Sequence, residues 1–203
     1  MKPNTRYICL DTETTGTLVK QGHKVLEIGC IEIIDDRITE RVYHTFLNPE
    51  REVDKEAEAI HGITFDKVKN EPKFANVAEK FLSFIKNSIL VIHNAPFDLI
   101  FLNTELELAG FPKIENEVID TLILARKKYI GERASLDALC KKFEIDATSR
   151  TLHGALMDAK LLAEVFIKLD QEMEVHLKHT NYIVENEFTR ADYSTMNFVT
   201  LSV

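Results

Sequence analysis

The sequence is poor in cysteine and has no long apolar run. Its three cysteines, Cys9, Cys30 and Cys140, form no CxxC pair, so we expect reduced core residues rather than a disulfide framework. No stretch approaches the roughly 18 consecutive apolar residues of a transmembrane helix, and no signal-peptide pattern is present. These absences predict a cytoplasmic protein with no membrane partner.

The chain also lacks an excess of positive charge and a glycine-rich phosphate loop. Its formal net charge is −8, which argues against a protein that grips long duplex DNA through a basic surface. An enzyme that holds a few nucleotides through metal ions is compatible with this charge. A kinase-like or nucleotide-binding enzyme is set aside, because no glycine-rich loop is present to cradle phosphates.

The most informative segment that is present is ICLDTETTG, at residues 8–16. A short apolar run leads into Asp11 and Glu13, which lie two residues apart. In a strand such residues point to the same face, so both carboxylates are expected side by side at the end of the strand. Two carboxylates this close repel each other unless a cation lies between them. Their oxygens suit Mg²⁺ or Mn²⁺, which predicts a divalent-metal site at the edge of a sheet.

The order of elements predicts one α/β domain with a mixed central sheet flanked by helices. Asp35 and Asp36 are expected to form the turn of a hairpin within this sheet. Strands are expected at residues 7–10, 25–34, 41–47 and 89–92, and a short strand running into a helix at 118–125. Helical spacing and helix-end signals predict helices at residues 75–85, 94–110, 135–143 and 155–169.

Two further acids lie in apolar or helix-starting surroundings. Asp98 falls in the first turn of a helix, where the helix dipole favours an anion; taken alone, this is a common structural role. Asp158 lies in an Ala- and Leu-rich helix and needs a partner there. His153 lies five residues earlier, too far around the helix to share a face with Asp158. We expect His153 on a mobile loop able to swing toward the metal site, although a lone loop histidine is most often simply solvated.

Three motifs occur in order along the chain: Asp11-x-Glu13, His93-Asn-x-x-Phe-Asp98 and His153-x-x-x-x-Asp158. Together they resemble the three motifs of the DEDDh 3′→5′ exonucleases, which have a ribonuclease-H-like fold. Residues 59–64, 135–140 and 143–153 resemble one branch of that family, the proofreading (epsilon) subunits of bacterial DNA polymerase III. The resemblance covers about residues 5–170. It implies an exonuclease domain at residues 1–170 and a C-terminal tail at 171–203.

The resemblance also implies a chemistry. The four acids would hold two Mg²⁺ or Mn²⁺ ions, the arrangement of two-metal phosphoryl transfer. Asp11 would bridge both ions, Glu13 and Asp158 would bind the ion nearer the attacking water, and Asp98 would act at the second ion. His153 would be the general base. The product would be a nucleoside 5′-monophosphate released from the 3′ end; for His153, a structural or phosphate-contacting role stays open.

Residues around these motifs are implied to hold the terminal nucleotide. Backbone N–H groups of the Thr-Thr-Gly segment would lie near it, and three other side chains resemble positions around the substrate pocket. Helix packing is an equal alternative for Phe97, and turn capping is one for His61. Asp120 matches a recurrent family acid, for which helix capping is the better interpretation. The predicted substrate-binding residues are Thr12, Thr14, Thr15, Gly16, His61, His93 and Phe97.

The partners follow from the same resemblance. In the family, the region after the catalytic domain tethers the nuclease to the polymerase III alpha (catalytic) subunit, so we expect the chain to act on single-stranded or frayed 3′ ends of DNA. Residues 194–198 faintly resemble a sliding-clamp-binding peptide, although packing of the tail on its own domain is an equal alternative. A free-standing DEDDh exoribonuclease that trims small RNAs, and an inactive nuclease-fold interaction module, stay open as alternative functions.

Overall fold

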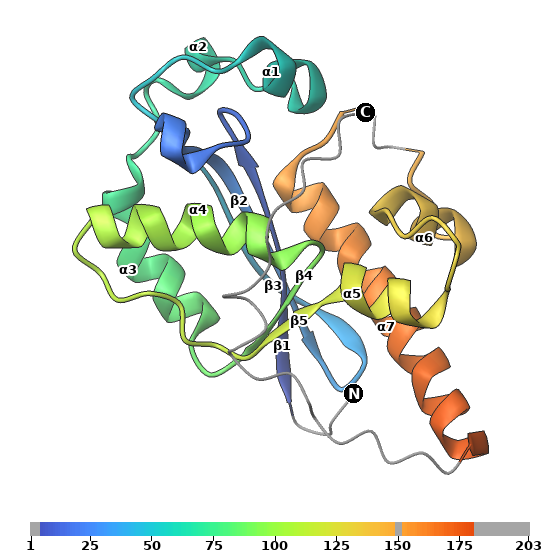
Figure 1. Ribbon diagram of the computed structural model, residues 1–203. Helices are drawn as coiled ribbons and strands as arrows, with labels where there is room; N and C mark the ends of the chain where they lie inside the picture. The colour runs from blue at the N-terminus through green and yellow to red at the C-terminus, as the bar shows by residue number, and fades with distance from the viewer. Residues whose placement is uncertain (1–4, 149–151, 181–203) are drawn as a thin grey trace.

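A mixed five-stranded sheet forms the centre of the molecule in a computed structural model that describes residues 5–148 and 152–180 (Figure 1). Its strand order is β3-β2-β1-β4-β5. The central strand β1 runs antiparallel to β2 and parallel to β4, which in turn runs parallel to β5. The strands are β1 Arg6–Thr14, β2 Val25–Ile34, β3 Arg37–Phe46, β4 Ile89–Ile92 and β5 Val118–Asp120. The predicted α/β class with a mixed sheet is confirmed.

The β2–β3 hairpin turns at Asp35 and Asp36, as predicted. Both residues have positive φ, 49° and 61°, the conformation of a two-residue turn that matches the twist of the flanking strands. Strand β3 begins directly after this turn, at Arg37, four residues before the predicted start at 41. The first half of β3 is largely solvent-exposed, and so it lacks the apolar residues by which a strand is recognised.

Helices cover both faces of the sheet (Figure 1). On one face, residues such as Ile8 and Leu10 of β1 pack with Phe81 of α3 and Phe101 of α4. On the other face, the alternate residues of β1 pack against α6 and α7. The helices are α1 Lys55–His61, α2 Phe65–Val68, α3 Phe74–Ile85, α4 Ala95–Leu108, α5 Thr121–Lys128, α6 Leu136–Lys142 and α7 Ala155–Thr180, with a short 3-10 helix η1 at Val19–Gln21.

Helix α7 is longer than the sequence predicts. It continues from Ala155 to Thr180, beyond the predicted end at 169, and so it runs through the predicted domain boundary at residue 170. The final segment at residues 181–203, with the clamp-like peptide at 194–198, lies outside the described residues. No helix in the described part of the chain is long and apolar enough to span a membrane.

Candidate active site

The first two acids lie within strand β1. The strand continues to Thr14, so Asp11 and Glu13 lie side by side near its end, as predicted. The strand is longer than the predicted range of 7–10. The two acids lie on the β1 face that packs against α7, because they alternate in register with Tyr7 and Cys9 on that face. This face places them opposite the helix that carries the last acid.

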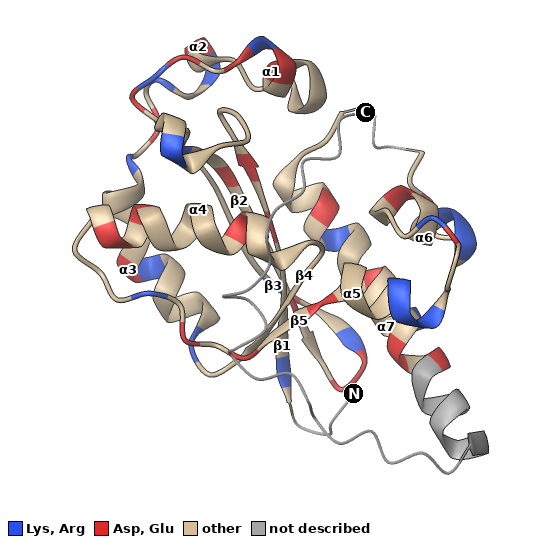
Figure 2. Ribbon diagram, viewed as in Figure 1, with Lys and Arg blue, Asp and Glu red and all other residues tan. Residues whose placement is uncertain are grey.

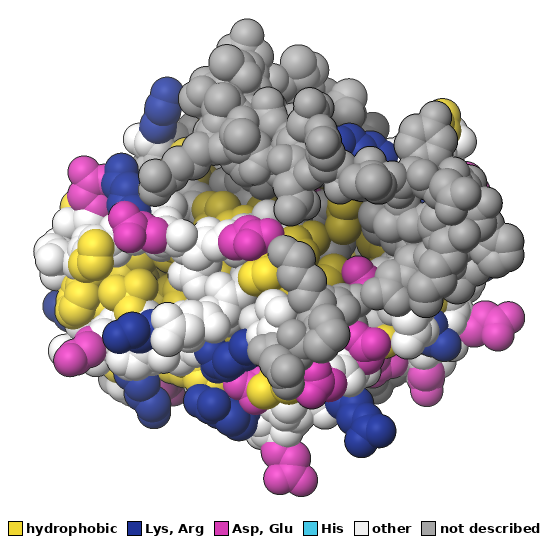
Figure 3. Space-filling view, turned by 90° about the horizontal axis from the view of Figure 1, so that it is seen from below, with side chains coloured by type: hydrophobic (Ala, Val, Ile, Leu, Met, Phe, Trp, Pro, Cys, Tyr) yellow, Lys and Arg dark blue, Asp and Glu magenta, His cyan; other side chains and the backbone are white. Residues whose placement is uncertain are grey.

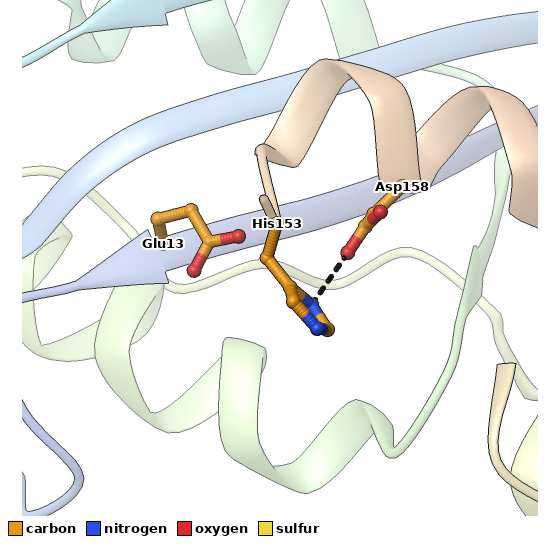
Figure 4. Close-up of side chains that lie close together, drawn as sticks. All are labelled: Glu13, His153 and Asp158. Atoms are coloured by element: carbon orange, nitrogen blue, oxygen red, sulfur yellow. Dashed lines mark hydrogen bonds and ion pairs between the residues drawn. The ribbon is translucent and has the colours of Figure 1, made fainter. Parts of the chain in front are cut away.

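Asp158 and His153 meet at the start of α7. Asp158 lies in the first turn of the helix and is 4% exposed, and its Oδ2 lies 3.1 Å from Nδ1 of His153 (Figure 4). His153 lies in the loop before the helix, as predicted, and this loop brings its ring to Asp158 although helical spacing alone would separate the two residues. The helix begins only at Ala155, so helical spacing does not apply to His153, and the chain before the helix folds back over its first turn.

Three groups converge beside β1. Ligand atoms of Glu13, His153 and Asp158 all lie within 4.8 Å of one another (Figure 4). Carboxylate oxygens are the ligands that Mg²⁺ and Mn²⁺ prefer, and the imidazole side chain of His153 is 45% exposed. The donor set therefore fits a divalent cation reached from solvent, with Asp11 two residues along the same strand face.

The segment that carries His153 is held from two sides. The backbone N–H of His153 donates to the carbonyl of Ile60 in α1 over 3.1 Å. Leu152 covers Gly62, which has φ +67° and where an added Cβ would lie 2.5 Å from Leu152 Cδ1. A hydrogen bond and an apolar contact thus hold residues 152–153 against the C-terminal end of α1.

Asp98 of helix α4 lies beside the part of β1 that carries Asp11 and Glu13. It lies in the first turn, as predicted, and is 3% exposed. The hydroxyl of Thr12 donates to its Oδ1 over 2.7 Å, so Asp98 lies beside the residue that separates Asp11 from Glu13. Burial raises the pKa of Asp98 to about 7, and the nearby Asp120 raises it too, while the Thr12 hydrogen bond opposes them. A buried carboxyl of this kind gains from a bound cation.

Asp120 is a capping residue, as the sequence interpretation favoured. Its carboxylate accepts N–H bonds from Leu122 at the start of α5 and from Asn94 and Ala95 at the start of α4. It therefore joins the first turns of two helices, because these turns leave backbone N–H groups without partners inside the helix. Through α4, this cap supports the helix end that carries Asp98.

The Thr-Thr-Gly segment is tied down by hydrogen bonds. The Thr14 hydroxyl donates to the Gly16 carbonyl over 2.8 Å. The Thr15 hydroxyl lies 3.0 Å from Nδ1 of His23, whose Nε2 lies 3.4 Å from an oxygen of Asp54. A Cβ at Gly16 would lie 2.3 Å from the His23 ring, so only glycine fits there. The backbone N–H of Thr15 is engaged as well, since it donates to the carbonyl of Lys24 over 2.9 Å.

His61 and His93 are anchored to the protein. His61 is 6% exposed; its Nδ1 accepts the N–H of Ile63 over 3.0 Å, so Nε2 carries the proton and donates to the carbonyl of Thr14 over 3.2 Å. Burial lowers the pKa of His61 and that of His93. Nδ1 of His93 lies 2.9 Å from the hydroxyl of Thr121. In both residues the ring supports the backbone around the site.

Phe97 is half-buried and packs on Phe101, with ring centroids 5.1 Å apart. Its position is that of the helix-packing alternative, with part of the ring left at the surface. A role in substrate binding stays a prediction for Phe97, as it does for His61, His93 and the Thr-Thr-Gly segment.

Sequence reasoning missed two features of strand β2. Glu27 is 4% exposed and faces Glu13 directly in the β1–β2 register. Gly29 lies opposite Asp11 in the same register, and an added Cβ there would lie 2.3 Å from the backbone of Ala155. The available signal was two acids, Glu27 and Glu32, and one glycine inside an otherwise apolar strand, VLEIGCIEII, which indicate buried partners and a close backbone approach.

The arrangement of carboxylates on a mixed sheet, with a histidine at the mouth of the site, defines a metal-dependent nuclease of the DEDDh class. The family model described as "Exonuclease" matches residues 8–166. The chain is 50% identical over 168 residues to the DNA polymerase III subunit epsilon of Rickettsia typhi, an alignment covering 81% of this chain and 73% of the relative. It is 46% identical over 173 residues to the subunit epsilon of Escherichia coli K12, covering 81% and 71%.

Solved structures show the same fold. Exonuclease X, in complex with a 5′-overhanging duplex DNA, superposes with a TM-score of 0.64 at 27% identity, covering 94% of this chain and 99% of that one. The nuclease domain of 3′hExo, a DEDDh family member bound to rAMP, superposes with a TM-score of 0.72 at 19% identity, covering 83% and 93%. The chain belongs to the exonuclease family, among the relatives of the DNA polymerase III epsilon subunits, and it uses divalent metal ions as that family does.

Proposed function

We propose that this chain is a proofreading 3′→5′ exonuclease, which removes mispaired 3′-terminal nucleotides from DNA as a subunit of the replicative DNA polymerase III. The observation that carries the proposal is the convergence of Glu13, His153 and Asp158 within 4.8 Å in a chain 46–50% identical to epsilon subunits. A buried acid paired with a solvent-exposed histidine is an arrangement for proton transfer as well as for metal binding.

Asp11, Glu13, Asp98 and Asp158 would hold two Mg²⁺ or Mn²⁺ ions. When bound, such ions activate a water and neutralise the charge that develops on the phosphate and on the leaving 3′ oxygen. His153 acts as the general base for the attacking water. With Nδ1 donating to Asp158, Nε2 is the nitrogen that accepts the proton. As the water oxygen bonds to phosphorus, the P–O3′ bond breaks, the leaving 3′ oxygen takes a proton from solvent, and a nucleoside 5′-monophosphate is released.

The proton taken up by His153 passes to solvent, since this side chain is 45% exposed. Asp158, 5% exposed, orients the ring from the buried side and stabilises the charged imidazolium. The Thr-Thr-Gly segment beside β1 would border the terminal nucleotide, with Thr12, His61, His93 and Phe97 around it.

We also propose that the polymerase delivers the substrate in the cytoplasm. The net charge is −8, which gives little electrostatic attraction for DNA. The end of the molecule away from the active site carries both acidic and basic side chains (Figure 3). Binding to the alpha subunit, and contact with the sliding clamp, would supply the DNA end at high effective concentration. The tail at residues 171–203 is the proposed tether, with residues 1–170 as the catalytic unit.

Digestion of 5′-labelled strands tests the substrate class. A DNA strand and an RNA strand of matching sequence are incubated with the protein and Mg²⁺ or Mn²⁺, with Asp11→Ala as the inactive control. Stepwise 3′ shortening of DNA, absent in the control, supports the proposal. A preference for RNA would instead indicate an exoribonuclease, and absence of metal-dependent cleavage of either strand would indicate an inactive interaction module.

A further inference from the structure

A buried acid outside the nuclease motifs lies directly beside the active site. Glu27 of β2 is 4% exposed and faces Glu13 across the β1–β2 ladder. Like charges directly opposite each other on a sheet repel, and a buried carboxylate needs partners. An acid at this position therefore requires compensation, and its contacts show where that compensation comes from.

Both oxygens of Glu27 are engaged. Oε2 accepts the backbone N–H of Ala155 over 3.0 Å, and Oε1 lies 2.7 Å from Nε2 of His44 on the neighbouring strand β3. An ionised carboxylate only accepts hydrogen bonds, so the His44 nitrogen is the donor. The carboxylate of Glu27 is thus stabilised by the imidazole of His44 and by the N-terminal end of α7, which offset the repulsion from Glu13.

Ala155 is the first residue of α7. The first N–H groups of a helix have no partner inside the helix, and a carboxylate at that end is favoured by the helix dipole. Glu27 supplies this acceptor from a strand 128 residues earlier in the chain. Asp158 lies in the same first turn, and His153 lies two residues before Ala155. The backbone N–H that Glu27 binds is therefore within three residues of both side chains.

The contact is steric as well as polar. Gly29, two residues along β2 from Glu27, lets the backbone of Ala155 come so close that an added Cβ would lie 2.3 Å from it. A Cβ at Gly154 would lie 3.8 Å from Oε2 of Glu27. The start of α7 therefore rests on β2 at two neighbouring points, one of which is set by a charged hydrogen bond.

We propose that Glu27 is a positioning residue for catalysis. Fixed by His44, its carboxylate clamps the first turn of α7 onto the sheet and sets the distances of His153 and Asp158 from Glu13. Each of its oxygens already has a protein donor, so we assign Glu27 to positioning and not to the metal-binding set. The expected effect on kcat rests on the proposed nuclease function. The contact between Glu27 and the start of α7 does not depend on that function.

The clamp is tested first without metal or substrate. Amide hydrogen exchange and the ¹⁵N–¹H chemical shift of Ala155 are measured in EDTA for the wild type, Glu27→Ala and Glu27→Gln. Loss of a hydrogen bond to a charged acceptor should speed the exchange of the Ala155 amide by about tenfold or more in Glu27→Ala. Glu27→Gln keeps an acceptor oxygen and should restore most of the protection. Unchanged exchange and shift in Glu27→Ala would overturn the clamp.

The kinetic test uses the same variants on single-stranded DNA with Mn²⁺. Displacement of catalytic groups by about 1 Å can cost about 100-fold in rate, so Glu27→Ala should lower kcat by that order while KM changes little, and Glu27→Gln should recover much of kcat. His44→Ala, which releases Oε1, should lower kcat to an intermediate value. Equal kcat in wild type and Glu27→Ala would overturn the positioning role.

Glu32→Ala is the matched control for Glu27→Ala, because Glu32 is a buried acid of the same strand that pairs with Arg6 and Thr39 instead. It should lower stability without changing kcat or the exchange of Ala155. If it changes both as Glu27→Ala does, general destabilisation explains the effect and the proposal fails. If the wild type cleaves no DNA, the nuclease function fails, whereas the Ala155 exchange still decides the clamp. Should Glu27→Ala not fold, His44→Ala gives the same readouts.

Discussion

The hydroxyl of Thr12 donates a hydrogen bond to Oδ1 of Asp98 over 2.7 Å, across 86 residues of sequence. This bond joins strand β1, which carries Asp11 and Glu13, to the first turn of α4. Helix α4 packs on the face of the sheet opposite α7. The bond links the first two nuclease motifs without any metal ion. It also stabilises the ionised form of a carboxyl whose pKa burial raises from 3.8 to about 7.

The raised pKa of Asp98 predicts how the stability of the metal-free protein depends on pH. The folded state keeps the Asp98 proton up to about pH 7, whereas the unfolded chain releases it near 3.8. Between these values the folded state binds more protons, so Asp98 makes the free energy of unfolding fall as pH rises from about 4 to 7. In Asp98→Asn this contribution should vanish, and urea unfolding in EDTA at several pH values measures it. The same pH slope in variant and wild type would contradict the assignment.

Thr12→Val should raise the pH up to which the free energy of unfolding falls. The valine keeps the volume of the buried Thr12 but cannot donate to Asp98, so the pKa of Asp98 should rise further. The fall in stability should then continue to a higher pH than in the wild type. NMR titration of the Asp98 carboxyl carbon checks this directly, and a pKa that is unchanged or lower would contradict it.

Asp158→Asn should nearly abolish nuclease activity while leaving the fold intact. The amide keeps the size of the buried side chain but removes the charge that a divalent ion needs, so we expect a loss of about 10³-fold or more in kcat/KM. Asp66→Asn is the control, because that side chain is 85% exposed and pairs only locally with Lys69. Comparable activities of the two variants would rule out a catalytic role for Asp158.

His153→Ala should lower kcat by about 100-fold or more if the imidazole is the general base. Activity across pH 5–9 is the measurement, and the loss should be greatest where the wild type is most active. A structural or phosphate-contacting role predicts a much smaller loss than that of Asp11→Ala, with the pH profile of the wild type retained.

Gly29→Ala should push the start of α7 away from the sheet. The added Cβ would lie 2.3 Å from the Ala155 backbone, so we expect about 1–3 kcal/mol of destabilisation from overpacking together with a marked loss of kcat. Cys30→Ala is the matched control, since Cys30 is the adjacent residue and packs in the core on the other face of the sheet. It should lose stability but keep kcat; a parallel loss of kcat in both variants would contradict a specific effect on α7.

Much of the fold was predictable because its elements are regular. Strand β2 and helix α3 matched their expected ranges closely, since one is almost continuously apolar and the other repeats apolar residues at helical spacing. The predicted range of strand β3 was too short, because its first residues face solvent and are not apolar. The end of α7 stayed open in prediction, because the polar residues after 169 lack apolar periodicity and fit either a frayed helix or a linker.

The site was predictable where it rests on spacing and unpredictable where it rests on contacts. The shared face of Asp11 and Glu13 follows from strand periodicity, the first-turn position of Asp98 follows from the helix-start signals before it, and the helical setting of Asp158 follows from its apolar neighbours. The folding back of His153 onto Asp158 does not, because it depends on the Ile60 carbonyl that receives its backbone N–H. The pairing of Glu27 with Ala155 likewise joins residues 128 positions apart, which no local pattern records.

Basic side chains do occur on helices α5 and α6 (Figure 2), including Arg126, Lys127 and Lys128 in the last turn of α5. Lys128 and Lys142 of this group pair with Glu172 and Glu132. Part of this positive charge is therefore balanced within the protein, consistent with a nuclease that receives its DNA from a partner.

The most direct measurement is the release of the 3′-terminal nucleotide from a primer labelled at that nucleotide, either paired or mispaired with its template. Wild-type protein and Asp11→Ala are compared with Mg²⁺, with Mn²⁺ and with EDTA. The account predicts metal-dependent release of a nucleoside 5′-monophosphate, faster from the mispaired end and absent in Asp11→Ala. Release that persists in EDTA or in Asp11→Ala, or no release from either primer, would contradict it.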